Sequence, residues 1–109
     1  MSNINIFYVD TKSFDFDNKE EVKRYYNLTS SREQSCPARK EYRKIFSGNV
    51  EKEIEDINVF LNWVYYKAQN FETKNEFADD RSMMVGDLVQ IDNNLYFCSS
   101  IGFTKTEWK

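Results

Sequence analysis

The two cysteines, Cys36 and Cys98, are the most reactive side chains in a sequence that contains no histidine. Without histidine, Ser-His-Asp and Cys-His catalysis and most zinc chemistry are excluded within this chain. Cys36 lies in a polar stretch near Arg32 and Arg39, and basic neighbours favour a reactive thiolate. Cys98 lies among apolar residues, where we expect a small buried hydrophobe. A Cys36-dependent enzyme is one hypothesis, and an incidental loop cysteine is the alternative.

Adjacent carboxylates are the remaining candidates for acid–base chemistry. Glu55 is followed by Asp56, and Asp79 by Asp80. Neighbouring side chains do not face each other in a helix or a strand, so we interpret both pairs as surface charges. The three glycines are isolated and form no phosphate-binding loop. We therefore predict a protein that is not an enzyme and that has no cofactor and no metal site.

A basic segment with an aromatic residue inside it is a candidate for binding. Tyr42 lies between Arg39 and Lys40 on one side and Arg43 and Lys44 on the other. Aromatic and basic residues alternating on a strand are typical of a nucleic-acid stacking platform. Nucleic-acid binders are usually basic, however, whereas this chain has a net charge of −3. Residues 18–48 carry a net charge of +4 and the remainder a net charge of −7. This asymmetry either steers a charged partner toward the protein or reflects two solvated faces.

The first secondary-structure element predicted along the chain is a strand over residues 3–9. Ile4, Ile6 and Tyr8 alternate with Phe7 and Val9. Both faces carry bulky side chains, which predicts a strand in the interior of a sheet.

A short helix is predicted over residues 19–27. Asp17 with Glu20, or Asn18 with Glu21, has the spacing of a capping box. The buried face is predicted to hold Val22, Tyr25 and Tyr26.

Residues 28–38 show no periodicity and contain Pro37, which predicts a mobile loop. A second strand is predicted over residues 40–47, with Tyr42, Lys44 and Phe46 on one face and Arg43 and Ile45 on the other. The sequence Ser47-Gly48-Asn49 is expected to end it.

The main helix is predicted over residues 50–69, with Asn49 as its N-cap. Phe60 and Trp63 lie off its apolar stripe and either widen the core or mark a contact surface. The stripe has a 3.6-residue period: Val50, Ile54, Ile57, Leu61, Val64, Tyr65 and Ala68.

The last part of the chain is predicted to be an ordered loop or short helix over residues 70–80, held by Phe71 and Phe77, followed by a β-hairpin. The hairpin turns at Asp92-Asn93-Asn94, because Asn tolerates positive φ. We expect residues 104–109 to trail off, with Trp108 tucked onto the body.

Together these patterns predict a single domain, residues 1–109, of the α+β class. A small, mainly antiparallel sheet packs against one main helix and ends in the C-terminal β-hairpin. Aromatic residues make up 17% of the chain, so rings should dominate the core. No apolar run is long enough to span a membrane and no leader opens the chain, from which we expect a cytoplasmic protein.

Nine residues of the segment 81–103 form a recognisable pattern: Arg81, Ser82, Met83, Val85, Asp87, Val89, Tyr96, Gly102 and Phe103. This pattern resembles the C-terminal signature of the YodL-like family, a small group of bacterial proteins associated with phages and mobile elements. Met84 stands where that signature usually has Ser. The resemblance implies a non-enzymatic accessory protein, and it implies no catalytic residue.

The function predicted from the sequence is that of a small cytoplasmic binding protein, phage or mobile-element encoded, that binds and modulates or inhibits a host protein such as a defence component. The alternative is a nucleic-acid-binding regulator that uses residues 39–44. Interfaces are enriched in aromatic residues and arginine, so the predicted contact residues are Arg39, Tyr42, Arg43 and Trp63.

Overall fold

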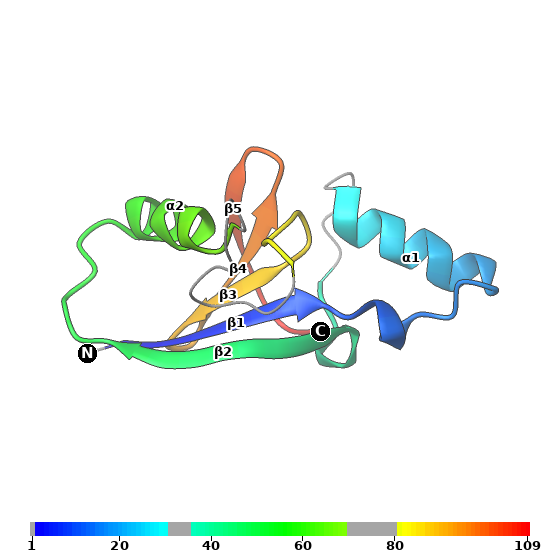
Figure 1. Cartoon of the computed structure of the whole chain (residues 1–109), viewed down its shortest axis with the longest axis horizontal. Helices are drawn as coiled ribbons and strands as arrows, with labels where there is room; N and C mark the ends of the chain where they lie inside the picture. Colours follow the sequence, from blue (N-terminus) through cyan, green and yellow to red (C-terminus); the bar gives the residue numbers. More distant parts are fainter. Residues whose placement is uncertain (1, 31–35, 70–80) are drawn as a thin grey trace.

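The computed structural model describes residues 2–30, 36–69 and 81–109, and it confirms the predicted α+β class with a C-terminal hairpin (Figure 1). The five strands form one antiparallel sheet in the order β2-β1-β3-β4-β5. The strands are β1 Ser2–Val9, β2 Tyr42–Val50, β3 Leu88–Ile91, β4 Asn94–Ser99 and β5 Gly102–Thr106. The helices are α1 Lys19–Ser30 and α2 Ile57–Lys67, with short 3-10 helices η1 Thr11–Ser13 and η2 Arg39–Glu41.

Strand β1 lies inside the sheet, as its two apolar faces predict. It pairs with β2 along one edge and with β3 along the other. Ile4, Ile6 and Tyr8 belong to the apolar cluster that includes α2, while Phe7 and Val9 belong to the cluster on the other face. Both faces of β1 are therefore core.

Strand β2 does not end at Ser47-Gly48-Asn49, and this prediction is wrong. The strand runs to Val50, which pairs with Ser2, and Gly48 pairs with Ile4. Because β1 extends to the start of the described chain, it offers a hydrogen-bonding edge to residues whose local sequence favours a turn.

A β-bulge changes which residues of β2 share a face. Ile6 pairs with Phe46 but Phe7 pairs with Lys44, so one residue of β2 is extra at this point. Tyr42 consequently packs in the same cluster as Phe7, whereas Phe46 packs against the α2 side. The prediction that Tyr42 and Phe46 share a face is wrong, because simple alternation assumes an unbroken ladder.

Helix α2 is shorter than predicted. It begins at Ile57, not Val50, and its N-cap is Asp56, not Asn49. The Asp56 carboxylate accepts hydrogen bonds from the backbone amides of Asn58 and Val59, which satisfies two amides that have no partner within the helix. The apolar period continues through residues 50–56, but Val50 pairs with Ser2 at the end of β2, and residues 51–56 belong to neither a helix nor a strand.

Helix α1 is capped by Asn18, whose side chain accepts from the amides of Glu20 and Glu21 at 2.9 and 3.4 Å. The helix extends to Ser30, past the predicted end. Its buried side chain is Leu28, at 1% exposure, whereas Tyr26 is 64% exposed. The predicted burial of Tyr26 is therefore wrong, and the ring that packs against the apolar cluster is that of Tyr25.

The predicted C-terminal hairpin is present, with a tighter turn than expected. Asp92 has a positive φ of 54°, and Asn94 already belongs to β4. Trp108 packs edge-on against Phe7 and Tyr42, at 5.1 and 5.7 Å between ring centroids, which confirms that it is tucked onto the body. Residues 104–106 belong to β5 and do not trail off.

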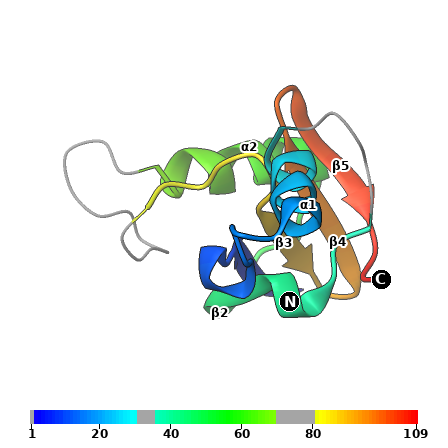
Figure 2. The same cartoon turned by 90° about the vertical axis from the view of Figure 1, so that its right-hand side faces the viewer.

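The predictions for residues 70–80 and for the middle of the 28–38 loop lie outside the described residues. Within the described chain the principal extents are 45, 31 and 23 Å, and the two helices lie toward opposite ends of the long axis (Figure 1). Figure 2 looks along that axis, with α1 nearest the viewer. None of the helices in the described ranges has the length and apolar character needed to cross a membrane.

Candidate functional site

Asp87, which pairs with Arg81, is the most deeply buried charged residue in the described part of the chain. Arg81 Nη1 donates to Asp87 Oδ2 at 2.7 Å, and Nη2 donates to Oδ1 at 2.9 Å. The backbone amides of Met84 and Val9 donate to the same carboxylate at 2.8 and 2.9 Å. Burial raises the pKa of Asp87, while these hydrogen bonds act in the opposite direction.

This arrangement is structural, because Asp87 is fully buried and both of its oxygens already accept two hydrogen bonds each. It joins the end of β1 to the segment that leads into β3. Gly86 lies in this segment with φ of 102°, and a Cβ there would lie 2.8 Å from the carbonyl oxygen of Leu28 in α1. Asp87 therefore ties down the entry to the hairpin.

Tyr42 does not belong to any exposed surface, which corrects its selection as a contact residue. It is 4% exposed, and its hydroxyl donates to the carbonyl of Gly86 at 2.7 Å. Burial and the nearby carboxylates of Asp87 and Glu41 raise its pKa above the ordinary value. Tyr42 is therefore a core residue that holds the 81–87 segment against β2.

The other residues of the basic segment are dispersed. The guanidinium of Arg39 lies 4.8 Å from the ring centroid of Phe7 and donates to the carbonyl of Tyr42. Arg43 and Lys44 are successive residues of β2, so their side chains leave opposite faces of the sheet. With the Tyr42 ring buried, residues 39–44 lack the exposed aromatic that a stacking platform requires.

Glu41 is buried and paired with Arg24 of α1 through two hydrogen bonds of 2.8 Å. Desolvation raises the pKa of Glu41, but the hydrogen bonds from Arg24 and from the amide of Ala38 outweigh it, and the net shift is downward. Local sequence alone did not reveal this pair, because its members are 17 residues apart.

The two cysteines lie in the environments that the sequence predicts. Cys36 is exposed and Cys98 is buried. Burial raises the pKa of the Cys98 thiol to about 12, with a further contribution from the Asp87 carboxylate, so this thiol is protonated at neutral pH.

The outer face of α2 carries an apolar stripe that the core does not use. Val59, Trp63 and Tyr66 are 65%, 47% and 62% exposed. Their spacing of four and three residues places them on one face of the helix. The opposite face buries Leu61 and Val64 against the sheet. Trp63, selected from the sequence because it lies off the buried stripe, therefore belongs to a second stripe.

A groove borders this stripe, between α2 and the segment that precedes it. We call it the α2 groove, and it has a volume of about 680 Å³. The ring of Trp63 stacks on Phe60 at 5.8 Å between centroids and an interplanar angle of 28°. The apolar lining consists of Val50, Ile54, Val59, Phe60 and Trp63. The charged rim consists of Lys52, Glu53, Glu55 and Asp56.

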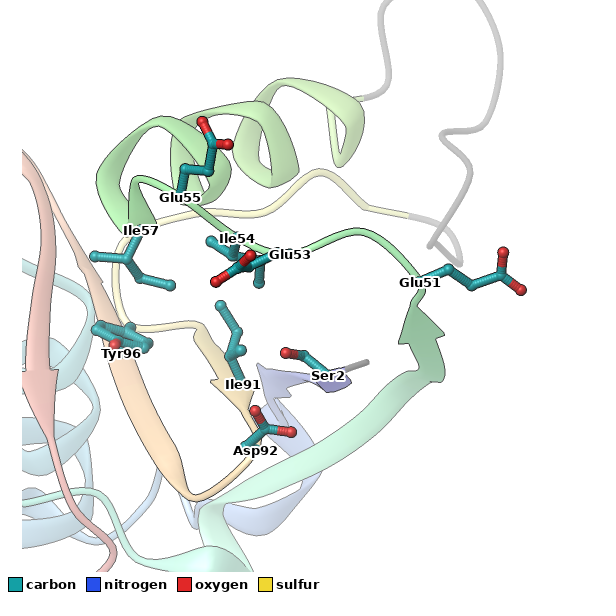
Figure 3. Close-up of a pocket in the computed structure, with 9 residues that line it drawn as sticks. All are labelled: Ser2, Glu51, Glu53, Ile54, Glu55, Ile57, Ile91, Asp92 and Tyr96. Carbon is teal, nitrogen blue, oxygen red and sulfur yellow. The ribbon is translucent and has the colours of Figure 1, made fainter.

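A second hollow lies on the other side of the same segment (Figure 3). Ile54, Ile57 and Ile91 point toward one another across it, and Glu51 points away from them. Its polar edge includes Asp92 of the β3–β4 turn. Ile54 lines both hollows and also packs against the core, so it anchors the acidic segment on the sheet.

The segment 51–56 is strongly acidic, with four carboxylates and one lysine in six residues. Within the described part of the chain, Glu51, Glu53 and Glu55 are exposed and form no ion pair. Asp56 is used as the cap of α2. Sequence reasoning placed these carboxylates on the first turns of a helix and so missed the groove that they border.

Among residues 2–30, 36–69 and 81–109, no three Cys, Asp or Glu side chains are grouped so that they could hold a metal ion. Comparisons with protein-family models, with curated proteins and with solved structures find no match to this chain. The resemblance of residues 81–103 to the YodL-like family accordingly stays a prediction.

Proposed function

We propose that this chain is a non-enzymatic binding protein that engages a protein partner through the outer face of α2 and the α2 groove. The observation that carries the proposal is the exposed apolar stripe of Val59, Trp63 and Tyr66 beside an apolar groove. Interfaces are enriched in exposed aromatic side chains that anchor in a partner, and a contiguous exposed apolar patch is typical of an interaction site.

The distribution of polar groups supports a binding role over a catalytic one. The buried carboxylates Asp87 and Glu41 are both held by arginines and backbone amides in structural contacts. The Cys98 thiol is buried. Val59, Trp63 and Tyr66 form an exposed apolar face on α2, and it borders the α2 groove.

The more specific form of the proposal follows from the resemblance in residues 81–103. It is a phage- or mobile-element-encoded accessory protein that binds a host protein in the host cytoplasm and inhibits or modulates it. Relative to the contact residues predicted from the sequence, the proposed surface keeps Trp63 and leaves out Tyr42, Arg39 and Arg43, which lie outside the stripe and the groove.

The two helices offer a matched experiment. Tyr66 on α2 and Tyr26 on α1 are 62% and 64% exposed, so replacing either by alanine removes the same side chain from a similar environment. A photo-crosslinking residue at position 59 would capture a partner from a bacterial lysate, and the captured protein would be identified, purified and titrated against the wild type and both variants.

We expect Tyr66→Ala to weaken binding of the purified partner at least tenfold and Tyr26→Ala to change it less than twofold. Circular dichroism melts would show that both variants are folded. Equal binding by the two variants, or no protein cross-linked specifically from position 59, would overturn the proposal.

A further inference from the structure

The charge around the α2 groove has a definite sign, and it differs from that of the basic region over residues 18–48. The groove and the adjoining hollow share an acidic border made by Glu51, Glu53, Glu55, Asp56 and Asp92, against one lysine, Lys52. Exposed carboxylates that form no ion pair within the described chain keep their hydration until a partner supplies cations.

The apolar part of the surface is elongated. Val59, Trp63 and Tyr66 follow the axis of α2 over two turns, and the groove continues the apolar strip past the start of the helix to Ile54 and Val50. A helix packs against such a strip with side chains spaced by three and four residues, and the groove would take one larger side chain between α2 and the acidic segment.

From this combination we infer that the partner segment that docks on α2 is a basic amphipathic helix, with a row of large apolar side chains flanked by lysines or arginines. The inference rests on the proposed function and deepens it. The apolar row packs on Val59, Trp63 and Tyr66, and the flanking cations lie against Glu53 and Glu55. Complementary charge raises the association rate and excludes acidic segments of equal apolarity.

The test uses synthetic helical peptides as probes, because their chemistry is fully defined. One peptide carries Leu or Phe with a helical repeat and Lys at the flanking positions. Its matched control keeps the apolar row and replaces each Lys by Glu. Affinity is measured by fluorescence anisotropy with the full chain, and the site is located by amide chemical-shift perturbation.

We expect the lysine peptide to bind at least tenfold more tightly than the glutamate peptide and to perturb residues 50–66. Glu53→Lys/Glu55→Lys should weaken the lysine peptide about tenfold. The matched variant Asp17→Lys/Glu107→Lys makes the same change in net charge at exposed positions away from the groove, and should weaken it less than twofold.

Equal weakening by the two charge-reversal variants would mean that only net charge matters, and it would overturn the inference. Binding of both peptides alike, or of neither, would also overturn it. The peptide measurements do not depend on the cross-linking from position 59. A partner that is captured at position 59 but docks through an acidic or uncharged segment would therefore refute this inference and leave the proposed function standing.

Discussion

The two helices are attached to the sheet by different means. Helix α2 inserts Leu61 and Val64 into the larger apolar cluster, which also includes its C-cap Ala68, and it has a second apolar stripe on its outer face. Helix α1 buries Leu28 and is tied to η2 by the Arg24–Glu41 ion pair. The outer face of α1 is rich in lysine and glutamate, as expected for a solvated helix. Helix α2 therefore exposes apolar surface that attachment to the sheet does not require.

The segment 81–87 is the part of the fold that both helices share. The amide of Met83 donates to the carbonyl of Ala68 at the end of α2, and Gly86 packs closely against the carbonyl of Leu28 at the end of α1. Asp87 holds this segment in place. Substitutions here should affect both helices, while substitutions on either helix should separate the two modes of attachment.

The largest effect is expected at the shared segment. Asp87→Asn removes the negative charge that pairs with Arg81. Because the Arg81 side chain is only 28% exposed, its guanidinium would then be largely buried without an ionic partner, and we expect the free energy of unfolding to fall by about 3–5 kcal/mol. Asp92→Asn is the control, because Asn can accept the same hydrogen bond and tolerates positive φ. Urea denaturation would measure the free energy of unfolding of the wild type and of both variants. A loss below 1 kcal/mol at position 87 would contradict a structural role for the pair.

The next effect separates the two faces of α2. Leu61→Ala removes a side chain that is 1% exposed and should cost about 2–5 kcal/mol. Trp63→Ala should cost about 1 kcal/mol, mostly through its stacking on Phe60, although the side chain is much larger. Thermal and chemical unfolding would compare the loss of stability in the two variants. An equal loss of stability in both variants would mean that the outer stripe is part of the core and not a binding surface.

An effect smaller than those of Asp87→Asn and Leu61→Ala concerns the attachment of α1, and it depends on pH. The pKa of Glu41 is lowered in the folded state, so its stabilisation is present above the ordinary carboxylate pKa of about 4.3 and is lost as the pH falls through the lower folded value. Glu41→Gln should cost about 1.5 kcal/mol at pH 7. The difference from the wild type should shrink below a pH of about 4.

Unfolding free energies of the wild type and Glu41→Gln across pH 3–7 would check this dependence. Glu107→Gln, at an exposed position, should change the stability at pH 7 by less than about 0.5 kcal/mol. A difference between Glu41→Gln and the wild type that is constant across the pH range would show that the carboxylate charge of Glu41 is not what binds α1 to η2.

Several elements could be read from local sequence because local chemistry decides them. The alternation over residues 3–9 marks β1, the Asn-rich turn marks the β3–β4 hairpin, and the spacing of Leu61, Val64 and Ala68 marks the buried face of α2. The burial of Cys98 also follows from its apolar neighbours along the chain. In each case the pattern that marks the element lies within a few residues of one short segment.

The tertiary structure decided the rest. The pairing of Val50 with Ser2 extends β2 at the expense of the predicted helix, and the bulge opposite Phe7 sends Tyr42 into the core. These outcomes depend on backbone hydrogen bonds between strands more than 30 residues apart in sequence, which local periodicity does not contain. Trp63 was recognisable from its position off the buried stripe. The groove beside it exists only because residues 50–56 turn away from the helix that their apolar spacing predicts.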